Sequence, residues 1–235
     1  MKKKAIFNWS GGKDSALALY KVLQSNEYEV VSLLTTVNSE HQRSSMHAIP
    51  IALLQEQADS IGIPIHLIEY APEEKIGGYE NCMRQAVEHF KKQGVHHFIF
   101  GDIFLHDVRS YREKQLAPYG IEVVEPLWDM KTTEVMQEFL QSGLKTIVVT
   151  TMADLLDKTY IGRLIDRSFV DDLPDGVDIT GENGEYHTFC FDGPMFKHPV
   201  RYSLGTPFKT SHSVNMDDGS QQTFNYWYAN LNNVN

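Results

Sequence analysis

The chain has 235 residues, of which 42% are hydrophobic and 22% charged, and its formal net charge is −10. A chain of this length buries about 70% of its unfolded surface, so its core needs no disulfides, and Cys82 and Cys190 fit a reducing compartment. The acidic balance disfavours nucleic-acid binding. No apolar run approaches the roughly 18 residues that cross a membrane. We therefore expect a cytoplasmic globular protein of one or two domains.

The first 150 residues alternate between strand patterns and helix patterns. Residues 5–9 form a short apolar run, and Ala16, Leu19, Tyr20 and Leu23 then share one helix face. This alternation predicts an α/β protein, with a Rossmann-like parallel sheet, right-handed crossovers and helices on both faces. The expected strands are residues 5–9, 30–37, 63–68, 97–100, 121–124 and 146–150, and the expected helices are residues 14–23, 50–61, 73–93, 107–119 and 132–141.

After about residue 154 the alternation ends, and glycines and prolines become frequent. Short strand patterns remain at residues 189–191, 200–203 and 223–228, and residues 230–235 are typical of a frayed tail. This change predicts a smaller α+β domain at the C-terminus. The expected division is residues 1–130 and residues 131–235, with the border between residues 126 and 155.

The sequence Ser-Gly-Gly-Lys-Asp-Ser, residues 10–15, lies between the first expected strand and the first expected helix. Its two glycines let backbone N–H groups approach an anion, and the helix turns its positive end, about half an elementary charge, towards the same point. The lysine adds a full charge, and the serines add hydroxyl donors. The Walker A spacing is absent. A plain turn capped by Asp14 is the alternative, but it does not explain the whole combination, so we predict phosphate binding.

A second polar segment, residues 178–196, reads DITGENGEYHTFCFDGPMF. Glu182 and Glu185 flank a glycine turn, and two carboxylates at this spacing are able to converge on a cation, an amine or ammonium. A solvated surface turn is the usual alternative for such a pair. The apolar residues 189–191 behind the turn favour a lined pocket.

These motifs resemble a known family. Residues 10–15 resemble the PP-loop of the N-type ATP pyrophosphatases, a motif that GMP synthetase-like, NAD synthetase-like and tRNA-modifying enzymes also carry. The second segment resembles the Gly-Glu-x-Gly-Glu-aromatic motif of the diphthine–ammonia ligase family. Residues 100–128 match that family's Gly-Asp-Ile … Gly … Pro-Leu-Trp pattern. Three motifs at these positions along the chain make the resemblance specific. The resemblance covers about residues 4–196.

The resemblance implies an adenine-nucleotide α-hydrolase-like domain over residues 1–130, a smaller substrate domain, and ATP held between them. It also implies that a carboxylate is activated as an acyl-adenylate and attacked by ammonia, which gives an amide, AMP and pyrophosphate. Mg²⁺ carried by ATP is the expected metal. Asp102 is a candidate to hold Mg²⁺ or the ribose, and helix capping is its alternative role.

The resemblance also implies roles for individual residues. Lys13 would stabilise charge on the leaving pyrophosphate, and Glu182 and Glu185 are the other candidate catalytic residues, one of which would bind ammonium and accept its proton. Thr35 and Thr36 are placed near the adenine on topology alone, and Arg112 and Glu113 are alternatively an exposed charged pair. The expected ATP and pyrophosphate contacts are Ser10, Gly11, Gly12, Lys13, Asp14, Ser15, Thr35, Gly101 and Asp102, and the expected substrate contacts are Arg112, Glu113, Glu182, Asn183, Gly184, Glu185 and His187.

The acceptor stays open at this point. The family's reference acceptor is diphthine on elongation factor 2, and a small-molecule carboxylate is the alternative. Two other functions compete: an adenylating tRNA-modifying enzyme, which the net charge disfavours, and a non-catalytic ATP-binding regulatory module, against which the two glutamates argue. Sulfur transfer is a minor alternative because no cysteine motif is present. A homodimer is expected from base rates alone.

Overall fold

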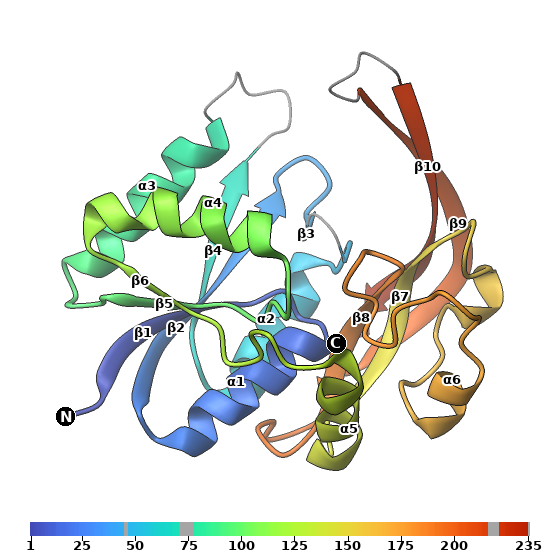
Figure 1. Cartoon of the computed structure of the whole chain (residues 1–235), viewed down its shortest axis with the longest axis horizontal. Helices are drawn as coiled ribbons and strands as arrows, with labels where there is room; N and C mark the ends of the chain where they lie inside the picture. Colours follow the sequence, from blue (N-terminus) through green and yellow to red (C-terminus); the bar gives the residue numbers. More distant parts are fainter. Residues whose placement is uncertain (45–46, 71–77, 216–220, 235) are drawn as a thin grey trace.

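The structure is a computed structural model that describes residues 1–44, 47–70, 78–215 and 221–234. Two β-sheets lie side by side, one with helices on both faces and one built from longer antiparallel strands (Figure 1). The predicted fold class, a parallel α/β sheet followed by a smaller α+β part, is confirmed. Among the described residues, no helix combines the length and the apolar character that a membrane crossing requires.

The first sheet has its parallel strands in the order β4-β2-β1-β5-β6. The chain first builds outwards from β1 in one direction and then, from β5, in the other. In open α/β sheets, ligands bind at the carboxyl edge where this reversal occurs, which here is the gap between the ends of β1 and β5. The strands are β1 (Lys3–Asn8), β2 (Tyr28–Asn38), β4 (Ile65–Tyr70), β5 (His97–Ile99) and β6 (Glu122–Val124), and a short β3 (Arg43–Ser44) pairs antiparallel to β2.

Alternate residues of β1 face opposite sides of the sheet, as the two-residue period of a strand requires. Ala5 and Phe7 are buried in the cluster that contains α1 and α2, whereas Ile6 is buried in the cluster that contains α3 and α4. The sheet is therefore covered on both faces, as predicted. The helices are α1 (Lys13–Ser25), α2 (Ile51–Ile61), α3 (Gly78–Lys91) and α4 (His106–Leu116), and a 3₁₀ turn (Ala117–Tyr119) follows α4. Residues 73–77 of the third expected helix lie outside the described residues.

The second sheet has the order β8-β7-β10-β9, and all its pairs are antiparallel. Two expectations are corrected here. The strand expected over residues 146–150 belongs to this sheet and not to the parallel one, because β8 and β10 take both of its edges. Residues 230–233 continue β10 and are not frayed. The elements are α5 (Thr132–Ser142), β7 (Lys145–Met152), a 3₁₀ turn (Lys158–Tyr160), α6 (Arg167–Asp171), β8 (Tyr186–Asp192), β9 (Tyr202–Asn215) and β10 (Gln221–Asn233).

The two sheets share one buried core. Phe7 of β1 and Leu54 of α2 belong to the same cluster as Phe189 of β8 and Leu231 of β10. The second sheet therefore packs against the α1 and α2 side of the first and presents β8 to the loop that follows β1. The first sheet ends at Val124 and the second begins at Lys145, and a border at residue 130 stays a prediction.

Candidate active site

The loop between β1 and α1 has a backbone that requires glycine. Gly11 has φ +83°, and a Cβ there would lie 2.9 Å from both Gln57 Oε1 and Ile49 Cδ1. Side chains rarely adopt that conformation, and no space exists for one. A Cβ on Gly12 would lie 2.6 Å from Cε1 of His47. Both glycines of the motif are thus needed, Gly11 for conformation and both for contact.

The first turn of α1 offers backbone donors to the adjoining space. Gly12 is the residue before the helix, and the Lys13 amide donates to Thr188 Oγ1 at 2.8 Å. Within the described part of the chain, the amides of Asp14 and Ser15 donate to no protein acceptor. Free amides at the positive end of a helix are suited to bind a phosphate oxygen.

Hydrogen bonds from β8 and from α2 stabilise this loop. Gly11 O accepts hydrogen bonds from the Cys190 amide of β8 at 2.8 Å and from Gln57 Nε2 of α2 at 3.0 Å. Gln57 is fully buried, and its Oε1 also accepts from Trp9 Nε1 at 2.9 Å. Because these contacts come from α2 and β8, the loop depends on both parts of the chain for its shape.

The backbone that follows β5 is in close contact with the first turn of α1. A Cβ on Gly101 would lie 2.9 Å from Cα and N of Ser15, which are backbone atoms that cannot move aside. The next residue, Asp102, pairs its carboxylate with Arg112 of α4. The residue before α4 is Leu105, so the capping alternative for Asp102 is wrong.

Arg112 is not the exposed partner of Glu113 that the sequence left open. Its guanidinium lies 4.0 Å from the ring centroid of Phe100 and 3.6 Å from Glu125 Oε1. The Glu125 side chain is fully buried, and burial, followed by the charge of Asp102, raises its pKa to about 7. Glu113 pairs instead with Arg109, at 2.9 Å.

The polar segment after residue 178 folds back onto the first sheet. Glu182 Oε1 accepts a hydrogen bond from the Ile103 amide at 2.8 Å. Burial raises the pKa of Glu182 to about 7, and the nearby charge of Asp14 contributes in the same direction. A carboxyl group that titrates near neutral pH is able both to hold and to release a proton under physiological conditions.

Glu185 has different surroundings from Glu182. It is buried, and its Oε1 accepts from the Asp178 amide at 3.0 Å and from Asn183 Nδ2 at 3.1 Å. Its Oε2 is also buried and has no hydrogen-bond partner in the described part of the chain. Glu185 therefore stabilises the turn of residues 178–185 through its hydrogen bonds. Glu182 instead contacts the segment between β5 and α4.

Lys13 lies where two loops meet, the β1–α1 loop and the segment of residues 178–185. Its side chain is only 3% exposed, and its Nζ lies 2.7 Å from Asp14 Oδ2, bonds to the Thr180 carbonyl and stands over the Tyr186 ring at 5.3 Å. Its charge is thus paired within the protein.

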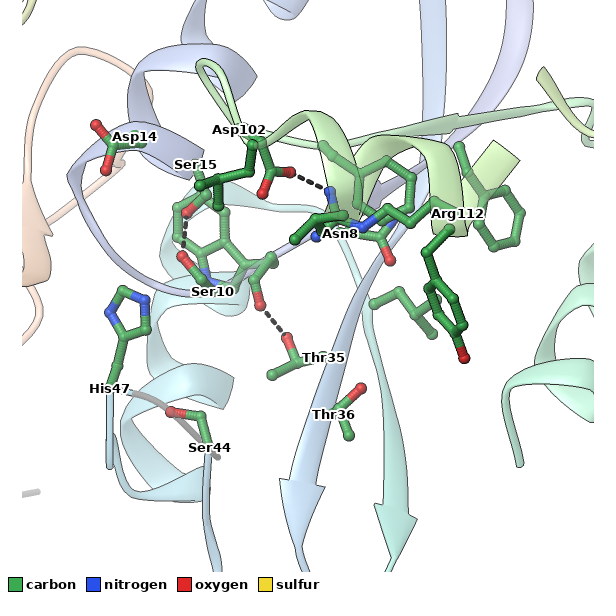
Figure 2. A pocket seen from close by; sticks show the side chains of 18 of the residues that line it. Asn8, Ser10, Asp14, Ser15, Thr35, Thr36, Ser44, His47, Asp102 and Arg112 are labelled. Carbon is green, nitrogen blue, oxygen red and sulfur yellow. Dashed lines mark hydrogen bonds and ion pairs between the residues drawn. The ribbon is translucent and has the colours of Figure 1, made fainter. Parts of the chain in front are cut away.

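A cavity of about 840 Å³ opens between the two loops and the α3–α4 side of the sheet. Figure 2 shows a hydrogen bond between the hydroxyls of Ser10 and Ser15, which line the cavity, and Thr35 bonds to the Trp9 carbonyl nearby. Leu34, Phe98 and Val87 line an apolar part. Of the predicted residues, the cavity is lined by Ser10, Lys13, Asp14, Ser15, Thr35, Gly101, Asp102, Arg112, Glu182, Asn183, Gly184 and His187, and its lining does not include Gly11, Gly12, Glu113 or Glu185.

The sequence interpretation missed several lining residues, above all His47. Its ring centroid lies 4.7 Å from that of His187, and its Nδ1 lies 2.9 Å from the Thr188 carbonyl oxygen. No motif marks His47, because it lies in an irregular segment between β3 and α2. Asn8, by contrast, is at the end of a strand that the pattern identified, so topology alone places it at the cavity. Thr36, which was expected near the nucleotide, also lines the cavity.

Carboxylates of Asp14, Asp102 and Glu182 line the same cavity. Among the described residues, no three His, Cys, Asp or Glu side chains are grouped to hold a metal ion by themselves. Oxygen donors that are few and separate fit an ion that brings most of its ligands with it, as Mg²⁺ does when it is bound to a nucleotide. The donor set therefore fits Mg²⁺ only together with phosphate oxygens.

Comparison with known proteins agrees with the sequence motifs. Residues 1–122 match the family described as "Diphthamide synthase N-terminal domain", and residues 131–210 match "Diphthamide synthase C-terminal domain". The chain is 24% identical over 214 residues to the diphthine–ammonia ligase of Danio rerio, covering 81% of this chain and 83% of that protein. It is 24% identical to the bovine enzyme and 23% to the human enzyme, each over 218 residues, 81% of this chain and 79% of the relative. The chain belongs to the diphthamide synthase family.

Proposed function

We propose that this protein is an ATP-dependent amide-forming ligase. It would activate a carboxylate as an acyl-adenylate with release of pyrophosphate, and then transfer the acyl group to ammonia with release of AMP. The relatives named above are diphthine–ammonia ligases, and membership of their family supports this reaction class. The observation that carries the proposal is the meeting of two loops at one cavity, with the β1–α1 loop on one side and Glu182 on the other.

The β1–α1 loop supplies the phosphate end of the proposed site. The amides of Asp14 and Ser15 and the hydroxyl of Ser10 would donate to phosphate oxygens. Lys13, whose Nζ lies 2.7 Å from Asp14 Oδ2, would stabilise the negative charge that grows on the pyrophosphate as it departs. Mg²⁺, when bound, would supply charge neutralisation for the phosphates, and Asp14 and Asp102, which line the cavity, are the carboxylates that would hold it.

Thr35 and Thr36 support an adenosine site next to the phosphate end. Both lie on β2, the neighbour of β1, and line the cavity together with Leu34. The apolar walls from Leu34 and Phe98 suit a flat base better than they suit a charged group.

Glu182 is the proposed proton acceptor for the nucleophile. Ammonia is mostly ammonium at neutral pH and must lose a proton before it attacks. A carboxylate whose pKa is about 7 would bind the cation and accept one of its protons, so that the lone pair of the ammonia left behind attacks the acyl-adenylate. Glu185, which holds the turn, is proposed to position Glu182 and Asn183 without touching the substrates.

The acceptor would be a carboxylate that enters beside Arg112 and Asn183, which line the cavity near Asp102 and Glu182. Diphthine on elongation factor 2 is the first candidate, because the relatives are named for it. A small-molecule carboxylate is the second.

The test is product formation from ATP, ammonium and each candidate carboxylate. We expect AMP and pyrophosphate in equal amounts, dependent on the carboxylate, and ADP with orthophosphate would refute the reaction class. Lys13→Ala should lower kcat by about a hundredfold or more. Lys209→Ala is the matched control, because Lys209 lies on the β9–β10 hairpin away from the cavity.

A further inference from the structure

The inference concerns His47 and His187, two histidines that share the phosphate end of the cavity. Their ring centroids lie 4.7 Å apart, and both side chains line the cavity with Ser10, Lys13 and Ser15. Figure 2 shows the His47 ring beside the β1–α1 loop, on the side towards Ser10 and Asp14. The reaction steps proposed above assign no role to His47 and none to His187 beyond its expected place among the substrate contacts.

We propose that His47 is a proton-coupled clamp for the phosphates: its ring takes up a proton from solvent when the nucleotide binds, and its Nε2–H then donates to a phosphate oxygen. This inference rests on the proposed function, since it takes the cavity to be the ATP site. It adds a binding residue and a pH dependence that the motifs do not contain.

The position of the ring is the first argument. A Cβ on Gly12 would lie 2.6 Å from His47 Cε1 and 3.0 Å from Nδ1. The imidazole therefore covers the face of the residue that immediately precedes α1. A phosphate bound to the free amides of that helix start would lie within reach of the same ring.

The hydrogen bond to Thr188 decides which nitrogen is free to titrate. Nδ1 of His47 lies 2.9 Å from the Thr188 carbonyl oxygen, and a carbonyl only accepts, so Nδ1 carries the hydrogen in both protonation states. Nε2 is then a lone pair in the neutral ring and a donor in the protonated ring. Only the protonated form suits a phosphate oxygen, because a lone pair would repel it.

The surroundings of the His47 ring, above all its burial, favour the neutral form before binding. Burial lowers the pKa of His47, and the Thr188 carbonyl and the Asp14 carboxylate oppose this effect, whereas Lys13 adds to it. Burial, His47 and Lys13 together hold the pKa of His187 well below its ordinary value. Two imidazolium rings this close would repel each other, so the pair accommodates about one proton.

A polyphosphate changes that balance. Lys13, the cation nearest the loop, is already paired with Asp14 at 2.7 Å, so the phosphate end carries little free positive charge of its own. A bound polyanion raises the pKa of a neighbouring imidazole. Protonation of His47 would supply the missing charge only while the anion is present and would remove it when pyrophosphate leaves.

The experiment measures proton uptake on binding of α,β-methylene-ATP with MgCl₂, by calorimetry in buffers of different ionisation enthalpy between pH 6 and 8.5. We expect the wild-type protein to take up a proton that His47→Asn does not. The Asn amide is able to replace the Nδ1 bond to Thr188 but cannot titrate. His47→Asn should bind about ten- to a hundredfold more weakly near pH 6.5, and the two affinities should converge as the pH rises. The ligand's own titration is common to both proteins and cancels.

Three further variants make the outcome decisive. His96→Asn, an exposed histidine outside the cavity lining, should behave as wild type. His187→Asn should keep the uptake, because His47 remains. His47→Gln replaces His47→Asn if the latter does not fold, as judged by circular dichroism.

Equal uptake and affinity in wild type and the folded His47 variant would overturn the inference and leave the proposed function intact. Loss of uptake in His187→Asn alone would overturn the assignment to His47. Absence of any binding by the wild-type protein would overturn the proposed function together with the inference.

Discussion

The two loops that meet at the cavity are built in different ways. The β1–α1 loop presents backbone groups, and its conformation depends on Gly11 at φ +83°. The segment from Asp178 to Glu185 presents side chains and holds its own shape through carboxylates, since Asp178 Oδ1 accepts from the Thr180 amide at 2.9 Å and Glu185 Oε1 accepts from the Asp178 amide at 3.0 Å. We therefore expect the β1–α1 loop to lose its conformation when side-chain volume is added. We expect the segment of residues 178–185 to lose its conformation when a charge or a hydrogen bond is removed.

The largest expected effect is on the first loop. Gly11→Ala should lower the free energy of unfolding by about 2–4 kcal/mol, because it adds both a strained φ and a collision with Gln57 and Ile49 at 2.9 Å. Gly94→Ala is the matched control, since Gly94 has φ +81° but no atom within 4 Å of an added Cβ. It should cost only the strain, about 1 kcal/mol. Denaturant unfolding measures both, and equal losses would contradict the steric argument.

The second effect concerns Glu182. Its folded pKa of about 7 is above the ordinary 4.5, so the basic form is lost as the pH falls through 7. The kcat/KM for ammonium should accordingly rise with pH through about 7, in addition to the rise that comes from ammonia itself. Glu182→Gln should lower it by about a hundredfold or more and remove the added slope. An unchanged slope in that variant would exclude Glu182 as the base.

Glu185 gives a smaller effect that separates positioning from chemistry. Glu185→Ala should lower the free energy of unfolding by about 1–3 kcal/mol, because it leaves the half-buried Asp178 amide without its acceptor. Glu185→Gln keeps an acceptor oxygen and should recover most of the stability and activity. If the Gln variant is as inactive as Glu182→Gln, then Glu185 takes part in the chemistry directly.

The smallest effect is expected at Glu113, which the resemblance placed among the substrate contacts. It pairs with Arg109 on the surface of α4, and its side chain is 51% exposed. Glu113→Gln should change stability by less than about 0.5 kcal/mol and leave kcat/KM unchanged. A clear loss of activity would return Glu113 to the substrate site.

The β1–α1 loop was the most predictable part of the site, because the sequence that makes it is continuous. Ser10, Lys13 and Ser15 follow a strand and begin a helix, and local geometry then brings them to one point. The same applies to Thr35, whose place on β2 follows from the order of parallel strands. The segment that contains Glu182 was also predicted, but the roles of Glu182 and Glu185 could not be assigned. Their separation in sequence does not show which of the two carboxylates lines the cavity.

Sequence alone determined the α/β class, the glycine loop between β1 and α1 and the motifs of the family, because each depends on residues close together in the chain or on a regular period. Only the tertiary structure decided that β7 joins the antiparallel sheet, that Arg112 bridges Asp102 and Glu125, and that His47 covers Gly12. These contacts join residues far apart in the sequence. They are selected by the packing of two sheets around one core, which no local pattern encodes.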